Sequence, residues 1–472
     1  MNIQNSMTTR FITFILIIFQ AIALIADNGD IAFTSLTANL AFSICYCMQK
    51  PSERAPLFAF VISFFILLLS RLYIPFIYDP DKLTYQSLFT AEAKYLPECY
   101  RQLSLALLSV VVIYMYSSSK RAKSDIQPIN FESAQIKSLR KCAKFLSLFT
   151  SVFFIYNAVK LAISNITMGY MSLYDGTSAA STFISFTAGK FNFCMYLYFA
   201  TMPCKKECRK MLWLFFICNA ITIFSGVRNN FVIPVIFLVL YLNFRNKINS
   251  GGEVWLSRKA ILTLIGVFPV FMILMYATML LRSGKDFNDI NIIDGLLSSI
   301  YQLGSSIEVI HNGIKYESFL HEQQWYSLTP IYDLLVHNPI TDFILGIPHI
   351  QQHTIERATQ AGDLASSLTY IDNPSRYFAF GGVGSSYITE GWLDMGYLGI
   401  ILYSSLYGYI LGAVWRWMNK NVWQIFFAFV VIAQIMFAPR SWATALFTVP
   451  FEAKSWPYLL IAYYCYKHPH RH

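Results

Sequence analysis

Long apolar runs separated by short polar segments make up most of the chain. A helix of about 20 apolar residues crosses the hydrocarbon core of a bilayer, so run length is the signal that identifies such helices. Runs that reach or approach this length lie at approximately 11–26, 31–48, 57–78, 103–118, 145–166, 183–202, 211–226, 231–244, 260–281, 390–414, 422–438 and 452–466. The pattern predicts an all-α polytopic membrane protein with about 12 transmembrane helices.

One large hydrophilic segment, residues 282–389, interrupts this pattern before the last three helices. We predict a helix over 292–313 within it and a second helical patch near 349–360. Long loops in compact proteins are usually functional. The chain therefore divides into residues 1–281 with helices 1 to 9, the loop at 282–389, and residues 390–472 with helices 10 to 12 and a short tail.

The composition supports a membrane protein, because 56% of the residues are hydrophobic and only 13% are charged, whereas soluble proteins carry about 25% charged residues. The net charge of +10 does not indicate nucleic acid, because most basic residues lie in alternate short loops. These loops hold Lys50 and Arg54; Lys120, Arg121, Lys123, Lys137, Arg140 and Lys141; Lys205, Lys206, Arg209 and Lys210; Arg245, Lys247, Arg258 and Lys259; Arg416 and Lys420; Lys467 and Arg471. Such loops are cytoplasmic in membrane proteins, so we predict that both termini are cytoplasmic and that residues 282–389 lie outside.

Cysteine and histidine spacing gives no metal or disulfide prediction. Most cysteines fall in predicted helices or cytoplasmic loops, and the Cys204/Cys208 pair lacks a second pair of ligands. His349, His353 and Glu356 have helical metal-ligand spacing, but a solvated helix is the favoured interpretation of this pattern. We expect neither a metal nor a cofactor.

Six basic residues are predicted at one depth, near the outer ends of the apolar runs. They are Arg71, Lys160, Lys190, Arg228, Arg282 and Arg440. Each one alone is compatible with a long side chain that reaches the interface. Together they are better explained by an anion in the outer leaflet, because the positive-inside rule should deplete that side of cations. A lipid phosphate or diphosphate is such an anion, and guanidinium groups match its oxygens.

Residues 381–399, GGVGSSYITEGWLDMGYLG, combine glycines, two serines and two carboxylates at the start of a predicted apolar helix. A carboxylate at a membrane entry is costly unless it is used. One interpretation is a loop-to-helix junction whose acidic residue caps the helix. The other is a catalytic or ligand-holding rim. The segment just before it contains the turn Asn373-Pro374-Ser375-Arg376-Tyr377.

These motifs resemble the Wzy-type O-antigen polymerases of Gram-negative bacteria. The shared pattern is an asparagine-proline turn with a tyrosine, then Gly384-Ser385-Ser386, Glu390 four residues on, and the glycine pair Gly396 and Gly399 entering a late helix. The many spans, the large loop before the last helices, and an arginine after Ser225-Gly226 in a middle hairpin also fit that family.

The resemblance implies a glycosyltransferase of the bacterial inner membrane whose active site faces the periplasm. Such an enzyme moves a growing glycan from undecaprenyl diphosphate to the sugar end of a new lipid-linked repeat unit. It implies the membrane lipid as surroundings, and a chain-length regulator and a flippase as partners.

The resemblance also suggests roles for individual residues. The diphosphate clamp is expected to comprise Arg228, Arg282 and Arg440, with Lys190 and Arg71 as weaker members. Glu390 is the candidate catalytic carboxylate, which would activate the acceptor hydroxyl, although it also fits a structural cap or an arginine partner. The residues expected to contact phosphate or sugar are Ser385, Ser386, Asn373, Tyr377 and Asp394.

Three other functions fit parts of the pattern. An O-antigen ligase to the lipid A-core differs only in its acceptor. A flippase for the same lipid fits the number of helices, but transporters place binding groups near the midplane and are built from repeats, and no repeat is visible here. A scaffold protein leaves the six cations without a function.

Overall fold

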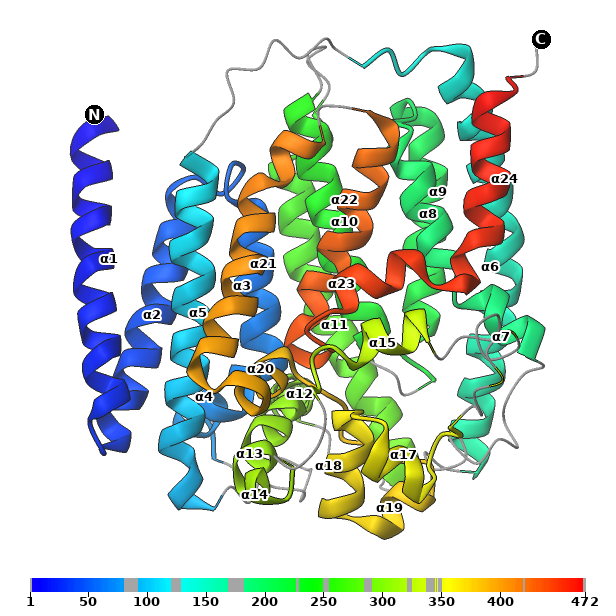
Figure 1. Cartoon of the computed structure of the whole chain (residues 1–472). Helices are drawn as coiled ribbons and strands as arrows, with labels where there is room; N and C mark the ends of the chain where they lie inside the picture. The colour runs from blue at the N-terminus through cyan, green and yellow to red at the C-terminus, as the bar shows by residue number, and fades with distance from the viewer. Residues whose placement is uncertain are drawn as a thin grey trace.

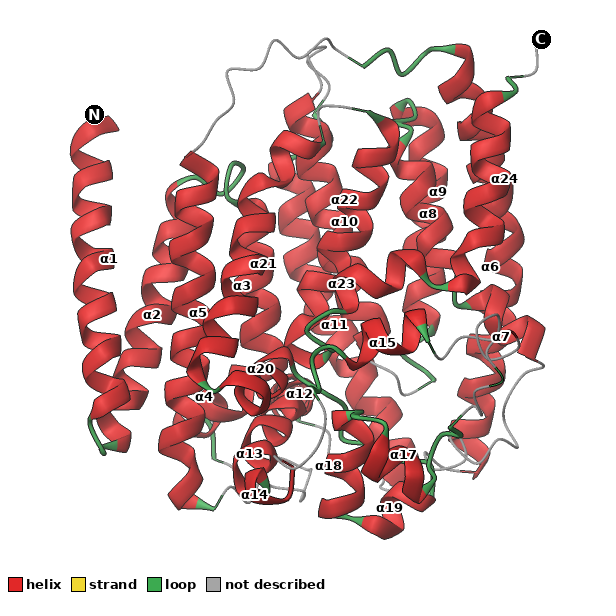
Figure 2. Ribbon diagram, viewed as in Figure 1, coloured by secondary structure: helices red, strands yellow, loops and turns green. Residues whose placement is uncertain are grey.

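The computed structural model describes residues 2–79, 92–119, 129–168, 182–225, 229–248, 254–283, 291–320, 325–336, 344, 346, 350–418 and 421–469. Within these ranges the regular structure is helical and no strand occurs, as Figures 1 and 2 show. The long helices run side by side, and both ends of the chain lie at the same end of the bundle, the top of Figure 1.

The helices up to residue 283 coincide with the first nine predicted ranges. They are α1 (Asn2–Ile25), α2 (Gly29–Gln49), α3 (Ala55–Phe64), α4 (Ser70–Ile77), α5 (Leu96–Ser119), α6 (Ala134–Met168), α7 (Thr182–Ala188), α8 (Phe191–Ala200), α9 (Lys205–Ile221), α10 (Asn229–Ile248) and α11 (Arg258–Ser283). The π-helix η1 (Phe65–Leu69) joins α3 to α4, and the 3-10 helix η3 (Ala93–Tyr95) precedes α5. The predicted range 183–202 is divided between α7 and α8.

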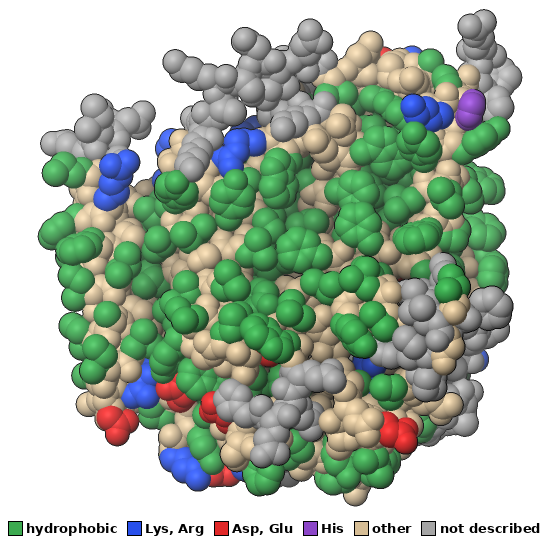
Figure 3. Space-filling model, in the orientation of Figure 1, with side chains coloured by type: hydrophobic (Ala, Val, Ile, Leu, Met, Phe, Trp, Pro, Cys, Tyr) green, Lys and Arg blue, Asp and Glu red, His purple; other side chains and the backbone are tan. Residues whose placement is uncertain are grey.

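Eight helical segments of the described residues are long and apolar enough to cross a membrane. They are Met7–Ile25, Gly29–Gln49, Ala55–Ile77, Ala93–Ser119, Ala134–Ser164, Asn230–Ile248, Tyr397–Trp417 and Val422–Arg440. On the face drawn in Figure 3, hydrophobic side chains cover the middle of the bundle and charged ones gather toward its two ends. The chain is therefore a polytopic, all-helical membrane protein. The number of twelve spans and their orientation stay predictions.

The large hydrophilic loop is folded into short helices at the end of the bundle opposite the termini (Figure 1). These helices are α12 (Ile292–Leu303), α13 (Ile307–Lys315), α14 (Glu317–Leu320), α15 (Thr329–Leu335), α17 (Ile355–Gln360), α18 (Leu364–Asp372), α19 (Pro374–Phe378) and α20 (Tyr387–Met395). The predicted helix 292–313 is interrupted by the 3-10 turn η6 (Gly304–Ser306). The predicted patch near 349–360 begins only at α17.

Ion pairs join these short helices to each other and to the bundle. Arg357 of α17 bonds Asp333 at 3.1 Å and Asp363 at 3.3 Å, which links α15, α17 and the start of α18. Lys315 at the end of α13 bonds Glu92 at 2.9 Å, just before η3. The loop is thus a packed layer below the bundle.

The predicted helix 390–414 is two helices, because the chain turns sharply at Gly396. Residue 396 has φ of 61° and ψ of −143°, a conformation that residues with a Cβ rarely adopt. The turn brings α20 back against α21 (Tyr397–Trp417). The backbones of Gly391 and Gly399 touch there, since a Cβ on Gly399 would lie 2.0 Å from the carbonyl oxygen of Gly391. The glycine pattern of the motif builds this hairpin.

The C-terminal part of the bundle differs from the prediction, because several short elements precede the last helix. After α22 (Val422–Phe437) come the short elements η7 (Ala438–Arg440), α23 (Ala445–Thr448), η8 (Val449–Phe451) and η9 (Ala453–Ser455), and then α24 (Trp456–Lys467). At 1.5 Å per residue, the 12 residues of α24 extend about 18 Å, short of a bilayer's roughly 30 Å. Figure 1 shows α24 starting about halfway along the bundle. α24 is accordingly not among the eight segments long enough to cross a membrane, and the twelfth span stays a prediction.

Candidate functional site

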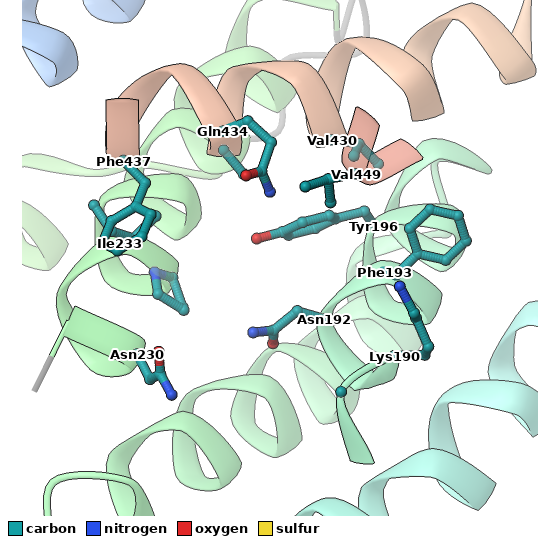
Figure 4. A pocket seen from close by; sticks show the side chains of 13 residues that line it. Lys190, Asn192, Phe193, Tyr196, Asn230, Ile233, Val430, Gln434, Phe437 and Val449 are labelled. Carbon is teal, nitrogen blue, oxygen red and sulfur yellow. The ribbon is translucent and has the colours of Figure 1, made fainter. Parts of the chain in front are cut away.

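A cavity of about 220 Å³ lies between α8, α10 and α22, with Val449 of η8 on one wall. Figure 4 shows Asn192 and Tyr196 of α8 and Gln434 of α22 pointing into it, with Asn230 of α10 at its edge. Polar groups inside a membrane bundle are costly and usually functional. Their convergence on one space marks this cavity as the candidate site.

The cavity's polar side chains have hydrogen-bonding capacity to spare. Asn192 exchanges amide hydrogen bonds of 3.2 and 3.1 Å with Asn219. Within the described part of the chain, no hydrogen bond occupies the side chains of Tyr196, Asn230 or Gln434. One hydroxyl and two amides therefore remain to bind oxygen-rich groups of a ligand.

Lys190 supplies the cavity with a cation. It precedes the first residue of α8 and is 6% exposed. Its ammonium group donates to Glu452 at 2.9 Å and to the Ser455 hydroxyl at 3.1 Å. Glu452 is partly exposed, so the pair is not fully desolvated. The sequence predicted that Lys190 would bind an anion, and the structure places it in the wall of a cavity.

The segment from Phe437 to Thr444 connects the cavity with the glycine-rich motif. Phe437 lines the cavity. Arg440 donates to the Ser305 hydroxyl at 2.7 Å, which ties η7 to η6. The Ala443 amide then donates to Glu390 at 2.8 Å, and the Thr444 hydroxyl to the carbonyl of Ser327 at 2.8 Å. Along the chain, Arg440 therefore lies between a cavity residue and the residue that bonds Glu390.

Glu390 is buried inside the fold. Its side chain has no exposed surface, and its two oxygens accept from the Ser385 hydroxyl at 2.5 Å and from the Ala443 amide. Burial raises the pKa of the Glu390 carboxyl well above its ordinary value, in a helix that lies outside the candidate spans. In this conformation Glu390 fastens α20 to the segment after η7, and its expected contact with an acceptor hydroxyl stays a prediction.

Asp394 has a similar anchoring position one turn further along α20. Its two carboxylate oxygens accept from the backbone amides of Tyr326 at 2.8 Å and Ser327 at 2.9 Å, and from the Ser327 hydroxyl. Tyr403 of α21 donates to the same Ser327 hydroxyl at 2.6 Å. These bonds draw the start of the 325–335 segment onto the α20–α21 hairpin.

The remaining predicted sugar-binding residues differ in their surroundings. Asn373 is exposed and caps α19 through the amide of Arg376 at 2.9 Å. Tyr377 is buried, and its hydroxyl donates to the carbonyl of Thr354 at 2.9 Å. Ser386 is fully buried, and its hydroxyl has no hydrogen-bond partner in the described structure. Of these three, only Ser386 has a buried polar group left over.

Arg71 is already neutralised. It follows η1, is 5% exposed and bonds the carboxylate of Glu308 and, at 3.0 Å, the carbonyl of Tyr301. Arg228 lies outside the described residues, although α10 begins right after it. Arg282 lies in the last turn of α11, and only its backbone is described. The structure thus brings Lys190 to the cavity and Arg440 to a neighbouring turn.

The sequence of the chain matches the model of the O-antigen polysaccharide polymerase Wzy family over residues 7–468. The match covers nearly the whole chain. The chain belongs to the Wzy O-antigen polymerase family. No curated protein and no solved structure gives a significant match.

Membership of the Wzy family makes the chain an O-antigen polymerase in general terms, acting on lipid-linked oligosaccharide repeat units in the membrane. Sequence reasoning missed the polar cavity residues of this Wzy chain: Asn192, Tyr196, Asn230 and Gln434. The amides within apolar runs are a usable signal, since such residues are rare in membrane helices without a function. The predicted site rested on the charged residues at that depth and on the polar residues of the segment 373–394.

Proposed function

We propose that this protein polymerises O-antigen on the periplasmic side of the inner membrane, and that the cavity at Lys190 receives the diphosphate of the lipid-linked donor. The single observation that carries the proposal is the cavity itself. It combines one ammonium group with amide and hydroxyl donors inside an apolar bundle. Phosphate oxygens accept from all of these groups.

In the proposed reaction the bond between the anomeric carbon of the growing glycan and its phosphate oxygen breaks. The bonding electron pair leaves with undecaprenyl diphosphate. A hydroxyl at the sugar end of the new repeat unit forms a bond to the anomeric carbon and loses its proton to a base. Negative charge grows on the departing diphosphate, so cations and fixed donors beside it stabilise the transition state. Lys190, Asn192 and Asn230 fit this task, and we include Arg228 and Arg282 in the clamp because of their positions in the chain.

Arg440 and Glu390 belong to the acceptor side of the proposed site. Glu390 holds the backbone at Ala443, three residues after Arg440. Release of the Ser385 hydroxyl would uncover one carboxylate oxygen as the base for the acceptor. Ser386 and Asp394 adjoin Glu390 on the same helix and its cap. The role of Glu390 as a base is proposed. What the hydrogen bonds show is that Glu390 anchors α20 to the segment at Ala443.

An aromatic group in the loop layer is suited to the acceptor's sugar rings. Tyr370, Tyr377 and Phe378 pack with ring centroids 5.5 to 5.8 Å apart. His353 and Phe380 extend the group, at 4.9 Å from each other, and both hold a positive φ of about 60°. Backbone strain of this kind persists where the surroundings fix it and is frequent in binding sites. Phe378 and Phe380 are exposed, so a sugar can stack on them.

The test is a lipopolysaccharide gel from a host lacking this gene and carrying each variant. We expect the empty host to make core with a single repeat and no ladder. Lys190→Met should lose about 1.5–3 kcal/mol of interaction with the diphosphate, or roughly ten- to a hundredfold in rate, and the ladder should shorten or vanish. Lys467→Met, an exposed lysine in the last turn of α24, is the matched control.

A double variant separates the two roles of Lys190. If Lys190→Met acts only by leaving Glu452 unpaired, Lys190→Met/Glu452→Gln restores the ladder and the proposed clamp is wrong. If Lys190 binds the diphosphate, the double variant stays defective. Glu390→Gln, with membrane abundance unchanged, should abolish the ladder if the carboxylate is the base. A bare core in the empty host would indicate a flippase or a ligase instead.

A further inference from the structure

A second and larger cavity lies at the end of the bundle that carries both chain termini. Its volume is about 770 Å³, and α1, α2, α5 and α21 form most of its wall. Nothing in the proposed reaction uses it, because the loop layer and the cavity at Lys190 belong to other parts of the bundle. Its residues therefore call for a separate explanation.

Buried polar side chains around Gln20 anchor α1 to α2 and α5, and the Thr13 hydroxyl of α1 also contacts the Met115 sulfur of α5 at 3.8 Å. Gln20 of α1 is buried and accepts from the hydroxyl of Ser35 of α2 at 2.9 Å. The Ser104 hydroxyl of α5 also donates to Gln20 and accepts from the amide of Asn39 at 2.8 Å. Toward the N-terminus α1 stands apart from α5 in Figure 1. Residues of both α1 and α5 line the cavity.

One face of α1 is directed toward this space. Arg10, Thr13, Phe14 and Ile17 line the cavity, and their spacing of three and four residues places them on one side of a helix. The sequence along this face changes from a charged residue at the top to apolar residues below. A ligand that follows α1 would meet a cation first and hydrocarbon afterwards.

The end of the cavity nearest the chain termini is strongly basic. Five basic side chains line it against one acidic side chain: Arg10, Lys50, Arg54, Lys247 and Arg416 against Glu53. Arg54 donates to Gln49 at 3.1 Å, Arg416 donates to the carbonyl of Ser117, and the Lys247 ammonium lies over the Trp415 ring at 4.3 Å. Lys50 bonds Glu53 at 3.4 Å on the exposed surface, where such pairs contribute little. The remaining excess of positive charge suits an anion.

The other end of the cavity, toward the middle of the bundle, is apolar. Phe14 and Ile17 are 60% and 44% exposed, and Val112 and Met115 of α5 also line the cavity. A soluble anion would leave this surface uncovered. A molecule with an anionic head and a hydrocarbon chain covers both ends at once.

We propose that this cavity binds one anionic glycerophospholipid of the leaflet in which the termini lie. Its phosphate binds near Arg10 and Lys50, and one acyl chain runs down between Phe14 and Val112. Basic residues next to a bilayer attract anionic lipids, and the volume is within the range of cavities that enclose small ligands. The proposal goes beyond the polymerisation reaction and does not rest on it.

The test is the lipid retained by the whole protein, purified in a mild detergent and weighed by native mass spectrometry. We expect the wild type, given dioleoyl phosphatidylglycerol and dioleoyl phosphatidylcholine in equal amounts, to retain one phosphatidylglycerol. Arg10→Gln/Lys50→Gln should retain it about thirtyfold more weakly, since each basic residue near the surface contributes about a factor of five. Lys137→Gln/Lys467→Gln changes the charge equally on exposed lysines outside the cavity and should retain it as the wild type does.

Val112→Phe provides a second variant that leaves every charge in place. It fills the apolar end and should abolish retention, while the melting temperature shows whether the bundle is intact. Equal retention in the wild type and both cavity variants would overturn the proposal, as would equal retention of the zwitterionic lipid. A polyprenyl phosphate bound in place of the phospholipid would also overturn it, because the cavity would then serve the substrate lipid.

Discussion

The contact between Gly391 and Gly399 allows a sharp prediction about the α20–α21 hairpin. Gly399→Ala would place a Cβ 2.0 Å from the carbonyl oxygen of Gly391, whereas real Cβ contacts essentially never fall below 3.0 Å. Both partners are backbone, so no flexible side chain can move aside. The two helices must separate by about 1 Å at this point.

The expected loss of stability is the sum of two destabilising contributions and one stabilising contribution. Overpacking of a tight contact costs about 1–3 kcal/mol. Separation of α20 from α21 also strains the bond between Glu390 and Ala443, and a buried hydrogen bond contributes about 1 kcal/mol. The better helix propensity of alanine returns about 1 kcal/mol. We therefore expect Gly399→Ala to destabilise the protein by about 2 kcal/mol.

The measurement is thermal unfolding of the purified protein in detergent, with Gly266→Ala as the control. Gly266 lies within α11, and among the described residues a Cβ there would have no atom of a neighbouring element within 4 Å. Its substitution gains propensity without a contact and should leave the melting temperature unchanged or raise it. Gly399→Ala should lower it and reduce the folded yield.

An equal melting temperature for the two variants would refute the reasoning. It would mean that α20 can move away from α21 without loss of stability, and that the glycine pair does not stabilise the hairpin. A lower melting temperature with a normal O-antigen ladder would keep the packing argument and separate it from catalysis.

Three further predictions test single polar groups. Asp394→Asn replaces a carboxylate that accepts from the backbone and hydroxyl of Ser327, so the melting temperature should fall by the equivalent of about 1–3 kcal/mol; an unchanged value would contradict this anchor. Ser386→Ala removes a buried hydroxyl without a partner, so stability should be kept or raised, and a loss of ladder at normal stability would assign the hydroxyl to the substrate. The hydrogen bond from Lys315 lowers the pKa of Glu92 below its ordinary value of 4.5. The pair therefore stabilises the fold above that pH and ceases to do so as the pH falls through the lower folded value, so the wild type should lose more stability than Glu92→Gln between about pH 5 and pH 3.

Run length predicted the helical part of the fold well, whereas the orientation that charge placement predicts stays a prediction. Hydrophobic burial within a bilayer requires long apolar stretches, and each of the predicted ranges coincides with one or two helices. The errors lie where backbone geometry overrides the apolar pattern. Residues 390–395 precede the apolar run 397–417 without a proline or a long polar break, and the chain turns at the positive φ of Gly396 between the two helices. The short α24 was missed for another reason, because the sequence of 438–455 did not reveal the four short elements that precede α24.

The candidate site was predictable only in part. Lys190 was found because a cation inside an apolar run is unusual, and it does line a cavity. The carboxylates of the glycine-rich motif were predicted as a rim, yet Glu390 and Asp394 accept hydrogen bonds from segments 50 or more residues away along the chain. Sequence spacing carries no information on such distant partners. Arg71 likewise forms an ion pair with Glu308, which no local sequence pattern predicts.

The short α24 has a consequence for how the protein is made. The translocon releases a segment into lipid when that segment is apolar along a full crossing, and exposed backbone groups at bilayer depth are costly. Residues 441–444 find their partners in Glu390, Ser327 and Tyr407, all of which are synthesised earlier. We therefore expect the C-terminal end of the chain to dock onto segments that are already in place, which are Ser327 and Glu390 at the loop layer and Tyr407 of α21. Assembly of the last helix in the membrane would then depend on a correctly folded loop layer.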